Sequence, residues 1–170
     1  GWEGPLLDFN ECRLQGAHNA EIIMAALAVG RVLKISLHQS SEVLKNQPPL
    51  SHRCETVAEV NGIRFINDSR STNLAAMEKT LASMPPAPGG TPNIWLLAGG
   101  RDKGCEFHNV GPLLSQRVKA ACLMGETREK LRSAWSLFTP CRLVKSLEDG
   151  VQQAFEMAEA TANEFVYGLT

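Results

Sequence analysis

An Asn-Gly pair between two apolar runs is the feature that most restricts the folds open to this chain. Residues 60–63 read Val-Asn-Gly-Ile. Asparagine and glycine tolerate the positive φ angles that a two-residue hairpin turn requires at both of its central positions. The sequence therefore predicts a hairpin of two antiparallel strands, at residues 54–60 and 63–67.

A polar loop and then a helical pattern follow the second predicted strand. The loop, residues 67–73, reads Asn-Asp-Ser-Arg-Ser-Thr-Asn. The apolar residues after it recur at the spacing of one helix face: Leu74, Met77, Leu81 and Met84. A loop that joins a strand to a helix start offers a ligand free N–H groups, a carboxylate and hydroxyls. Residues of these types also cap helices, and Thr72 or Asn73 fits that simpler role as well.

Apolar segments alternate with helical patterns through the rest of the chain. We expect strands at residues 93–98, 120–124, 142–144 and 165–169, with helices between them. Strands that alternate with helices imply right-handed crossovers and a mostly parallel sheet. The fold class expected from residue 50 onward is therefore α/β: a Rossmann-like, mostly parallel sheet with the antiparallel hairpin at its edge.

Residues 1–49 show a different pattern, with helices rather than alternating elements. Asn19 is a candidate N-cap for a helix that Gly30 would end, and a second short helix is expected at residues 41–46. Before these helices, the apolar side chains of residues 6–9 are compatible with a short strand. This part of the chain is expected to be distinct from the α/β domain.

The composition is that of a globular chain with balanced charge. Of the 170 residues, 44% are apolar and 21% are charged, and the formal net charge is −1. This balance lacks the electrostatic footprint of nucleic-acid binding and of a basic membrane patch. The five cysteines form no C-x-x-C pair, so a structural zinc site is not expected. Free thiols in this pattern suit a reducing cytoplasm.

Membrane insertion and secretion are not expected from the sequence. The longest apolar run, residues 22–29, is too short to span a bilayer, and no basic region precedes an apolar core at the N-terminus. The chain starts with Gly1 rather than methionine and stops at Thr170, directly after a predicted strand. We interpret it as a fragment of a longer protein.

Three segments together resemble the C-terminal region of the Mur ligases. They are LSHRCETV at residues 50–57, NGIRFINDSRSTN at residues 61–73 and LLAGGRDKG at residues 96–104. The family usually reads L-P-H-R-x-E, then N-D-S-K-A-T-N, then a glycine-rich segment with a lysine, in this order and at similar spacing. The Asp-Ser-x-x-Thr-Asn run favours the branch that adds D-glutamate, because sister ligases carry other residues after the Asp.

The resemblance implies a domain organisation and a reaction. Residues 1–49 would be the incomplete C-terminal tail of the central ATP-binding domain, and residues 50–170 a Rossmann-like C-terminal domain truncated at its end. Ligases of this branch join D-glutamate to UDP-N-acetylmuramoyl-L-alanine in peptidoglycan precursor synthesis, through an acyl phosphate formed with ATP. The resemblance implies a cytoplasmic enzyme that is monomeric at full length.

The resemblance also implies which residues contact the ligands. The expected ATP contacts are His18, Asn19, Arg53, Asp68 and Arg70. Arg53 suits the phosphates and Asp68 suits a ribose hydroxyl, whereas Thr72 and Lys103 would hold the carboxylates of D-glutamate. No catalytic residue and no metal ligand are expected in this fragment, because the phosphate-binding loop and most Mg²⁺ contacts belong to the upstream domain. The isolated chain is therefore expected to be inactive.

Two positions depart from the family pattern. Ile22 stands where the family often has an asparagine that faces adenine, and Arg70 replaces the usual lysine with a cation of different geometry. Two alternatives stay open: the departures favour the first, and the Asp68-Ser69-x-x-Thr72 run speaks against the second. One is a non-catalytic α/β module that binds a nucleotide or a partner. The other is a related ligase with a different substrate, such as another Mur ligase or a folylpolyglutamate synthase.

Overall fold

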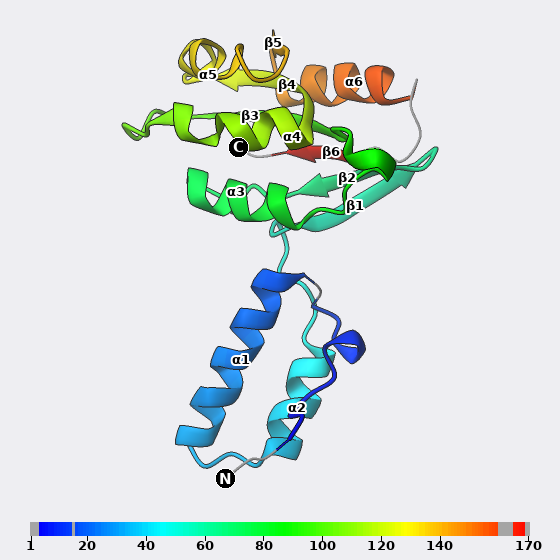
Figure 1. The fold of residues 1–170 in the computed structure, drawn as a ribbon, viewed down its shortest axis with the longest axis vertical. Helices are drawn as coiled ribbons and strands as arrows, with labels where there is room; N and C mark the ends of the chain where they lie inside the picture. The colour runs from blue at the N-terminus through cyan, green and yellow to red at the C-terminus, as the bar shows by residue number, and fades with distance from the viewer. Residues whose placement is uncertain (1–3, 15, 160–164, 169–170) are drawn as a thin grey trace. The chain divides into compact units, whose positions relative to one another are not determined.

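The structure, a computed structural model, describes residues 4–14, 16–159 and 165–168, except for the side chains of Ala17 and His18. The chain divides into two compact units, Gly1–Leu50 and Ser51–Thr170. The first unit is built around two α-helices, and the second is a sheet flanked by helices (Figure 1). Each unit has a hydrophobic core of its own.

The described part of the second unit contains a single six-stranded sheet in the spatial order β1-β2-β6-β3-β4-β5. In chain order the strands are β1 (Glu55–Val60), β2 (Ile63–Asn67), β3 (Ile94–Gly100), β4 (Val118–Gly125), β5 (Cys141–Leu143) and β6 (Phe165–Gly168). Strand β1 pairs antiparallel with β2, and all other neighbouring strands pair in parallel. The predicted fold class, a mostly parallel α/β sheet with an antiparallel edge hairpin, is confirmed.

The hairpin turn forms at the predicted Asn-Gly pair. Asn61 and Gly62 have φ angles of 53° and 78°, as a two-residue turn of this type requires. Strand β1 begins at Glu55, one residue later than predicted. Cys54 has a φ angle of 47°, which a strand does not accommodate.

Helices cover both faces of the sheet. They are α3 (Leu74–Ser83), α4 (Gly111–Arg117), α5 (Arg128–Trp135) and α6 (Leu147–Ala158), with two short 3-10 helices, η2 (Pro88–Gly90) and η3 (Phe107–Val110). The apolar residues of α3, α4 and α5 share one buried cluster on one face, and those of α6 share another on the opposite face (Figure 1). The connections after β2, β3 and β4 therefore lead to helices on the same side of the sheet.

Helix α3 follows the apolar pattern read from the sequence. The side chain of Asn73 accepts a hydrogen bond from the Ala76 N–H at 2.9 Å and caps the start of the helix. Met77 and Leu81 are 2% and 0% exposed, and they pack with Met84 into the core on this face. Burial of such side chains contributes about 1.5–3 kcal/mol each, so this face anchors α3 to the sheet.

The first unit contains the 3-10 helix η1 (Phe9–Glu11) and the helices α1 (Ala17–Val32) and α2 (Leu37–Asn46). Ile23 and Leu27 of α1 are buried in its small core. Helix α2 is longer than the predicted 41–46, because Ser36 caps it by accepting a hydrogen bond from the Gln39 N–H at 3.2 Å.

Three details predicted for this unit were wrong. The strand expected at residues 6–9 does not form, and a 3-10 helix starts at the end of that segment. Helix α1 begins after Gly16, so Asn19 lies in the first turn instead of capping it. The helix also continues through Gly30, where a Cβ would lie 2.9 Å from the Ser40 Oγ of α2. The glycine allows two helices to approach and does not end the first one.

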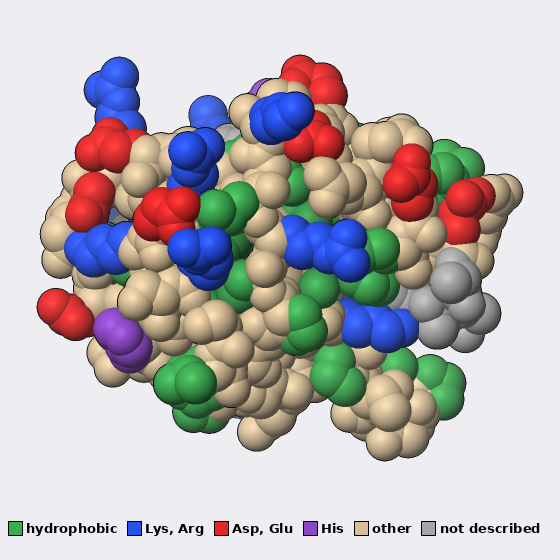
Figure 2. Space-filling view, turned by 90° about the horizontal axis from the view of Figure 1, so that it is seen from above, with side chains coloured by type: hydrophobic (Ala, Val, Ile, Leu, Met, Phe, Trp, Pro, Cys, Tyr) green, Lys and Arg blue, Asp and Glu red, His purple; other side chains and the backbone are tan. Residues whose placement is uncertain are grey.

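Among the helices that the structure describes, none has the length and apolar character needed to cross a membrane. Figure 2 shows basic and acidic side chains interspersed over the visible face, with apolar side chains between them. Charge of one sign does not gather on this face, in keeping with the formal net charge of −1.

Candidate functional site

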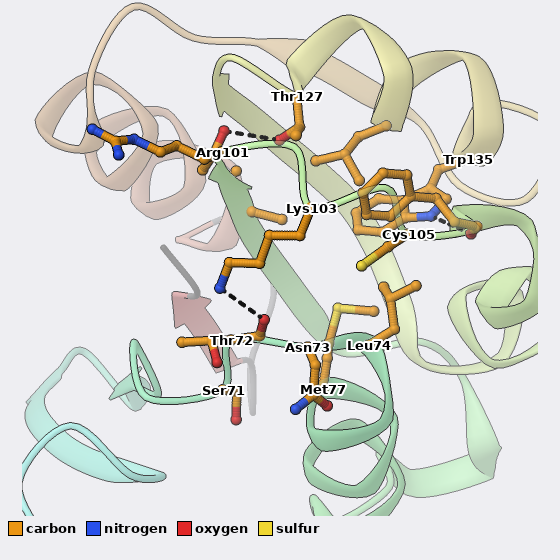
Figure 3. Close-up of a pocket in the computed structure, with 15 residues that line it drawn as sticks. Ser71, Thr72, Asn73, Leu74, Met77, Arg101, Lys103, Cys105, Thr127 and Trp135 are labelled. Carbon is orange, nitrogen blue, oxygen red and sulfur yellow. Dashed lines mark hydrogen bonds between the residues drawn. The ribbon is translucent and has the colours of Figure 1, made fainter.

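A cavity of about 380 Å³ opens at the carboxyl ends of β3 and β4, beside the start of α3 (Figure 3). Open α/β sheets bind ligands at this edge, where loops after the strands meet the N-termini of helices. The polar part of the wall contains Ser71, Thr72, Asn73, Lys103 and Thr127. The apolar part contains Leu74, Met77, Phe107, Leu131 and Trp135.

Two glycines at the end of β3 shape the cavity wall. A Cβ at Gly99 would collide with the backbone carbonyl of Met124, so only glycine allows β3 and β4 to lie this close together here. Gly100 has a φ angle of 130°, which L side chains rarely adopt, and the chain turns there into loop 101–106. The glycine pair thus sets the course of the loop that carries Lys103.

Lys103 reaches across the cavity toward the loop that follows β2. Its ammonium nitrogen lies 3.5 Å from the backbone carbonyl oxygen of Thr72. Figure 3 shows this contact and shows that the neighbouring Arg101 extends away from it. The structure therefore brings together the two residues that the sequence analysis assigned to the carboxylates of D-glutamate.

Loop 101–106 is held in place by Asp102. The Asp102 carboxylate accepts hydrogen bonds from the Gly104 N–H at 2.8 Å and from the Lys130 ammonium of α5 at 3.0 Å. The Gly104 N–H, and then Lys130, hold the pKa of the Asp102 carboxyl below its ordinary value. Both side chains are substantially exposed, so the pair orients the loop more than it stabilises the fold.

The apolar part of the cavity is closely packed. The Trp135 indole N–H donates a hydrogen bond to the Phe107 carbonyl at 2.9 Å, and the two rings meet edge to face with centroids 6.4 Å apart. Leu131 and Trp135 are 3% and 1% exposed. A cavity with a cation and hydroxyl at its mouth and an apolar wall suits a small charged molecule with an aliphatic stem.

Asp68, an expected ATP contact, is 1% exposed and is bonded inside the domain. Its Oδ1 accepts a hydrogen bond from the Cys54 N–H at 3.0 Å. Its Oδ2 accepts hydrogen bonds from the hydroxyls of Ser71, Thr80 and Tyr167. A carboxylate has about four lone-pair sites, so these four donors leave it little capacity for a ligand. In this structure Asp68 joins segments of the domain and presents no exposed acceptor.

Arg53 and Arg70 are exposed cations on two loops that contact each other, loop 51–54 and loop 68–73. The Arg70 N–H donates a hydrogen bond to the His52 carbonyl at 3.0 Å. Guanidinium groups pair bidentately with phosphate oxygens. The structure thus places both arginines on adjoining loops, each with its side chain exposed.

The remaining predicted ATP contacts belong to the first unit. His18 and Asn19 lie in the first turn of α1. The side chain of His18 is outside the described part of the structure. Ile22, which stands in place of the family asparagine, is 47% exposed. These residues therefore lie in a different unit from Arg53 and Asp68.

Metal and thiol chemistry have little support in the described residues. Within the described ranges, no group of three or more His, Cys, Asp or Glu side chains is arranged to hold a metal ion. Burial raises the pKa of the thiols of Cys54, Cys122 and Cys141, which disfavours the thiolate form.

Three residues that shape the site were not among the predicted ones: Asp102, Lys130 and Tyr167. Asp102 lies inside the glycine-rich motif, so its position next to Lys103 could have drawn attention to it. Lys130 is 28 residues away from Asp102 in the chain, and Tyr167 is 99 residues away from Asp68. No local sequence signal identifies contacts at such separations.

Comparison with known proteins places this site in a family. Residues 52–167 match the family described as Mur ligase, glutamate ligase domain. Two curated proteins named UDP-N-acetylmuramoylalanine--D-glutamate ligase are similar to the chain. The one from Geobacter metallireducens is 35% identical over 147 residues, and the one from Geobacillus kaustophilus is 38% identical over 161 residues. The alignments cover 86% and 93% of this chain and 31% and 34% of those proteins. The chain thus spans about a third of their length.

Solved structures agree on the fold. The UDP-N-acetylmuramate-alanine ligase MurC of Thermotoga maritima matches 93% of this chain and 35% of its own, with a TM-score of 0.65 and 14% identity. The MurF ligase of the same organism, solved in complex with ADP, matches 91% of this chain and 35% of its own, with a TM-score of 0.60 and 13% identity. Such identities show the fold alone. Because the family match covers most of the chain, the resemblance read from the three motifs is confirmed, and the chain belongs to the Mur ligase family through its glutamate ligase domain.

Proposed function

We propose that this chain is the acceptor-binding part of an ATP-dependent ligase that adds D-glutamate to UDP-N-acetylmuramoyl-L-alanine. The names of the curated relatives support this substrate pair. The observation that carries the proposal is the approach of Lys103 Nζ to within 3.5 Å of the Thr72 carbonyl, across a cavity at the ligand-binding edge of the sheet. This contact brings Lys103 and Thr72 to one side of the cavity, and a dicarboxylic amino acid would use both a cation and a hydroxyl donor.

The cavity chemistry supports an amino acid with two carboxylates. Lys103 supplies a positive charge for one carboxylate, and the Thr72 hydroxyl and the start of α3 supply donors for the other. The apolar wall would contact the methylene groups between them. A cavity of about 380 Å³ has room for such a molecule.

We propose that ATP approaches loops 51–54 and 68–73, where Arg53 and Arg70 face solvent. His18 and Asn19 remain predicted contacts from the first unit. A direct contact with Asp68 would require the exchange of one of its internal hydrogen bonds. Mg²⁺ is proposed to bind mainly in the central ATP-binding domain, as the family resemblance implies.

In the proposed reaction, this chain would mainly position the amine of D-glutamate. A carboxylate oxygen of the nucleotide-linked substrate attacks the terminal phosphate of ATP and displaces ADP. The amine of D-glutamate then attacks the acyl carbon, expels phosphate and loses a proton. Phosphoryl transfer depends mainly on positioning and charge neutralisation, and this chain would supply the positioning of the amine. We expect the complete enzyme to be a cytoplasmic monomer and the isolated chain to be inactive.

The test uses the complete reading frame that contains this chain. ADP release is measured with UDP-N-acetylmuramoyl-L-alanine and D-glutamate, L-glutamate or no amino acid. We expect turnover only with D-glutamate, and we expect Lys103→Ala to raise the KM for D-glutamate by about tenfold or more, because a charge-assisted contact is lost. Lys145→Ala is the matched control, because Lys145 is an exposed lysine outside the cavity.

Other outcomes would change the assignment. Turnover with another amino acid or with a folate would support a ligase that acts on a different substrate. An absence of turnover in folded protein would favour a binding module. ATP hydrolysis by the isolated 170-residue chain would contradict the expectation that it is inactive.

A further inference from the structure

Asp68 joins four separate parts of the domain. Its carboxylate accepts hydrogen bonds from loop 51–54 through Cys54, from loop 68–73 through Ser71, from α3 through Thr80 and from β6 through Tyr167. The backbone adds a further link, because the Asp68 N–H donates to the Gly168 carbonyl at 3.0 Å. A buried carboxylate with every partner in place gives its segment one well-defined position.

The two loops that Asp68 joins carry the residues assigned to two different ligands. Cys54 follows Arg53, and Ser71 precedes Thr72. The loops also touch directly, through the hydrogen bond from the Arg70 N–H to the His52 carbonyl. A displacement of Asp68 would therefore move loop 51–54 and loop 68–73 together.

Tyr167 donates its hydrogen bond to Asp68 from a central strand of the sheet. It lies on β6, between β2 and β3, and is 0% exposed. Burial, and then the hydrogen bond to Asp68, raise the pKa of the Tyr167 phenol, so it remains a neutral donor. Its ring packs in the core cluster with Met77 and Leu81, which leaves the hydroxyl little freedom to find another partner.

We propose that Asp68 and Tyr167 form a positioning junction that couples loop 51–54, which carries Arg53 for ATP, to loop 68–73, which carries Arg70 for ATP and Thr72 for D-glutamate. The inference rests on the proposed function for the identity of the two ligands, and on the hydrogen bonds alone for the coupling. Tyr167 touches neither ligand and acts through Asp68. Binding of either substrate would then depend on the same buried hydroxyl.

The test compares Tyr167→Phe with Thr139→Val in the complete ligase. The first change removes the hydroxyl and leaves the ring in the core. The second removes another buried hydroxyl, which donates to the Val118 carbonyl at 3.0 Å and touches neither loop. We expect Tyr167→Phe to raise the KM for ATP and the KM for D-glutamate by similar factors, about threefold to tenfold each. Thr139→Val should lower the unfolding midpoint and leave both KM values unchanged.

A second variant and a second measurement distinguish a loss of coupling from a folding defect. Thr80→Val removes another donor to the same carboxylate with little change in shape, and it should also raise both KM values. Hydrogen exchange of the Cys54 and Arg70 amides should accelerate in Tyr167→Phe but not in Thr139→Val.

Each outcome decides the proposal. A rise in only one KM, or wild-type exchange rates at both amides in Tyr167→Phe, would overturn the coupling. If the wild-type ligase shows no turnover that requires D-glutamate, the proposed function fails. The exchange rates of Cys54 and Arg70 then still decide whether the junction couples the two loops.

Discussion

The ammonium of Lys103 lies 3.5 Å from the backbone carbonyl of Thr72, although the two residues are 31 positions apart in the chain. Parallel strands produce this contact, because the loops after β2 and β3 leave the sheet at the same edge. Asp102 and Lys130 hold one loop, and Asp68 holds the other. The site is thus built from two separately anchored loops, and each anchor can be tested by itself.

The first prediction concerns the Thr72 hydroxyl. Thr72→Val in the complete ligase keeps the size of the side chain and removes a donor to a carboxylate. The KM for D-glutamate should rise about tenfold, and the KM for ATP should not change. Thr91→Val, at an exposed position outside the cavity, is the control. An unchanged KM for D-glutamate would remove Thr72 from the site.

The second prediction concerns the anchor of loop 101–106. Asp102→Asn weakens the pairing with Lys130, so Lys103 should be less well placed and the KM for D-glutamate should rise about twofold to fivefold. Glu129→Gln breaks an ion pair with Arg132 on the same helix, at 2.8 Å, and should have no such effect. Equal effects of the two substitutions would point to helix charge, and not to loop position, as the cause.

The third prediction concerns acid. Because the folded-state pKa of Asp102 is lowered, its ionised form stabilises the folded state. That contribution is present above the ordinary pKa of about 3.9 and disappears as the pH falls through the lower folded-state value. Asp102→Asn should therefore unfold at lower urea than wild type at neutral pH, and the difference should shrink and vanish as the pH falls through the folded-state pKa of Asp102. A difference that persists into that acid range would contradict this account.

The fourth prediction concerns the close approach of β3 and β4. Gly99→Ala places a methyl group against the Met124 carbonyl, a backbone atom that the paired strand holds in place. The free energy of unfolding should fall by about 1–3 kcal/mol, as overpacking usually costs. Gly168→Ala, also in a central strand, meets its nearest neighbour at 4.0 Å and should change stability by less than about 1 kcal/mol. Urea unfolding of both variants measures the contrast, and equal losses would refute the role of Gly99.

Local sequence patterns were enough to predict most elements of the second unit. The Asn61-Gly62 pair predicted the hairpin because its turn conformation depends on two adjacent residues. The alternation of apolar strands with amphipathic helices predicted the parallel sheet, since the crossover rule needs only the order of elements. Patterns were less informative in the first unit, where Gly30 lies at a contact between two helices and not at a helix end.

In the candidate site, too, local motifs predicted some features and only the tertiary structure showed others. The motifs by themselves selected Thr72 and Lys103, because short segments of sequence carry them. Only the tertiary structure decided what Asp68 does. Its four hydrogen-bond donors come from positions 3 to 99 residues away, and the folded sheet and helices bring them to one carboxylate. Local sequence determines which conformations a segment adopts, whereas the burial of a polar group and the identity of its partners depend on the packing of distant segments.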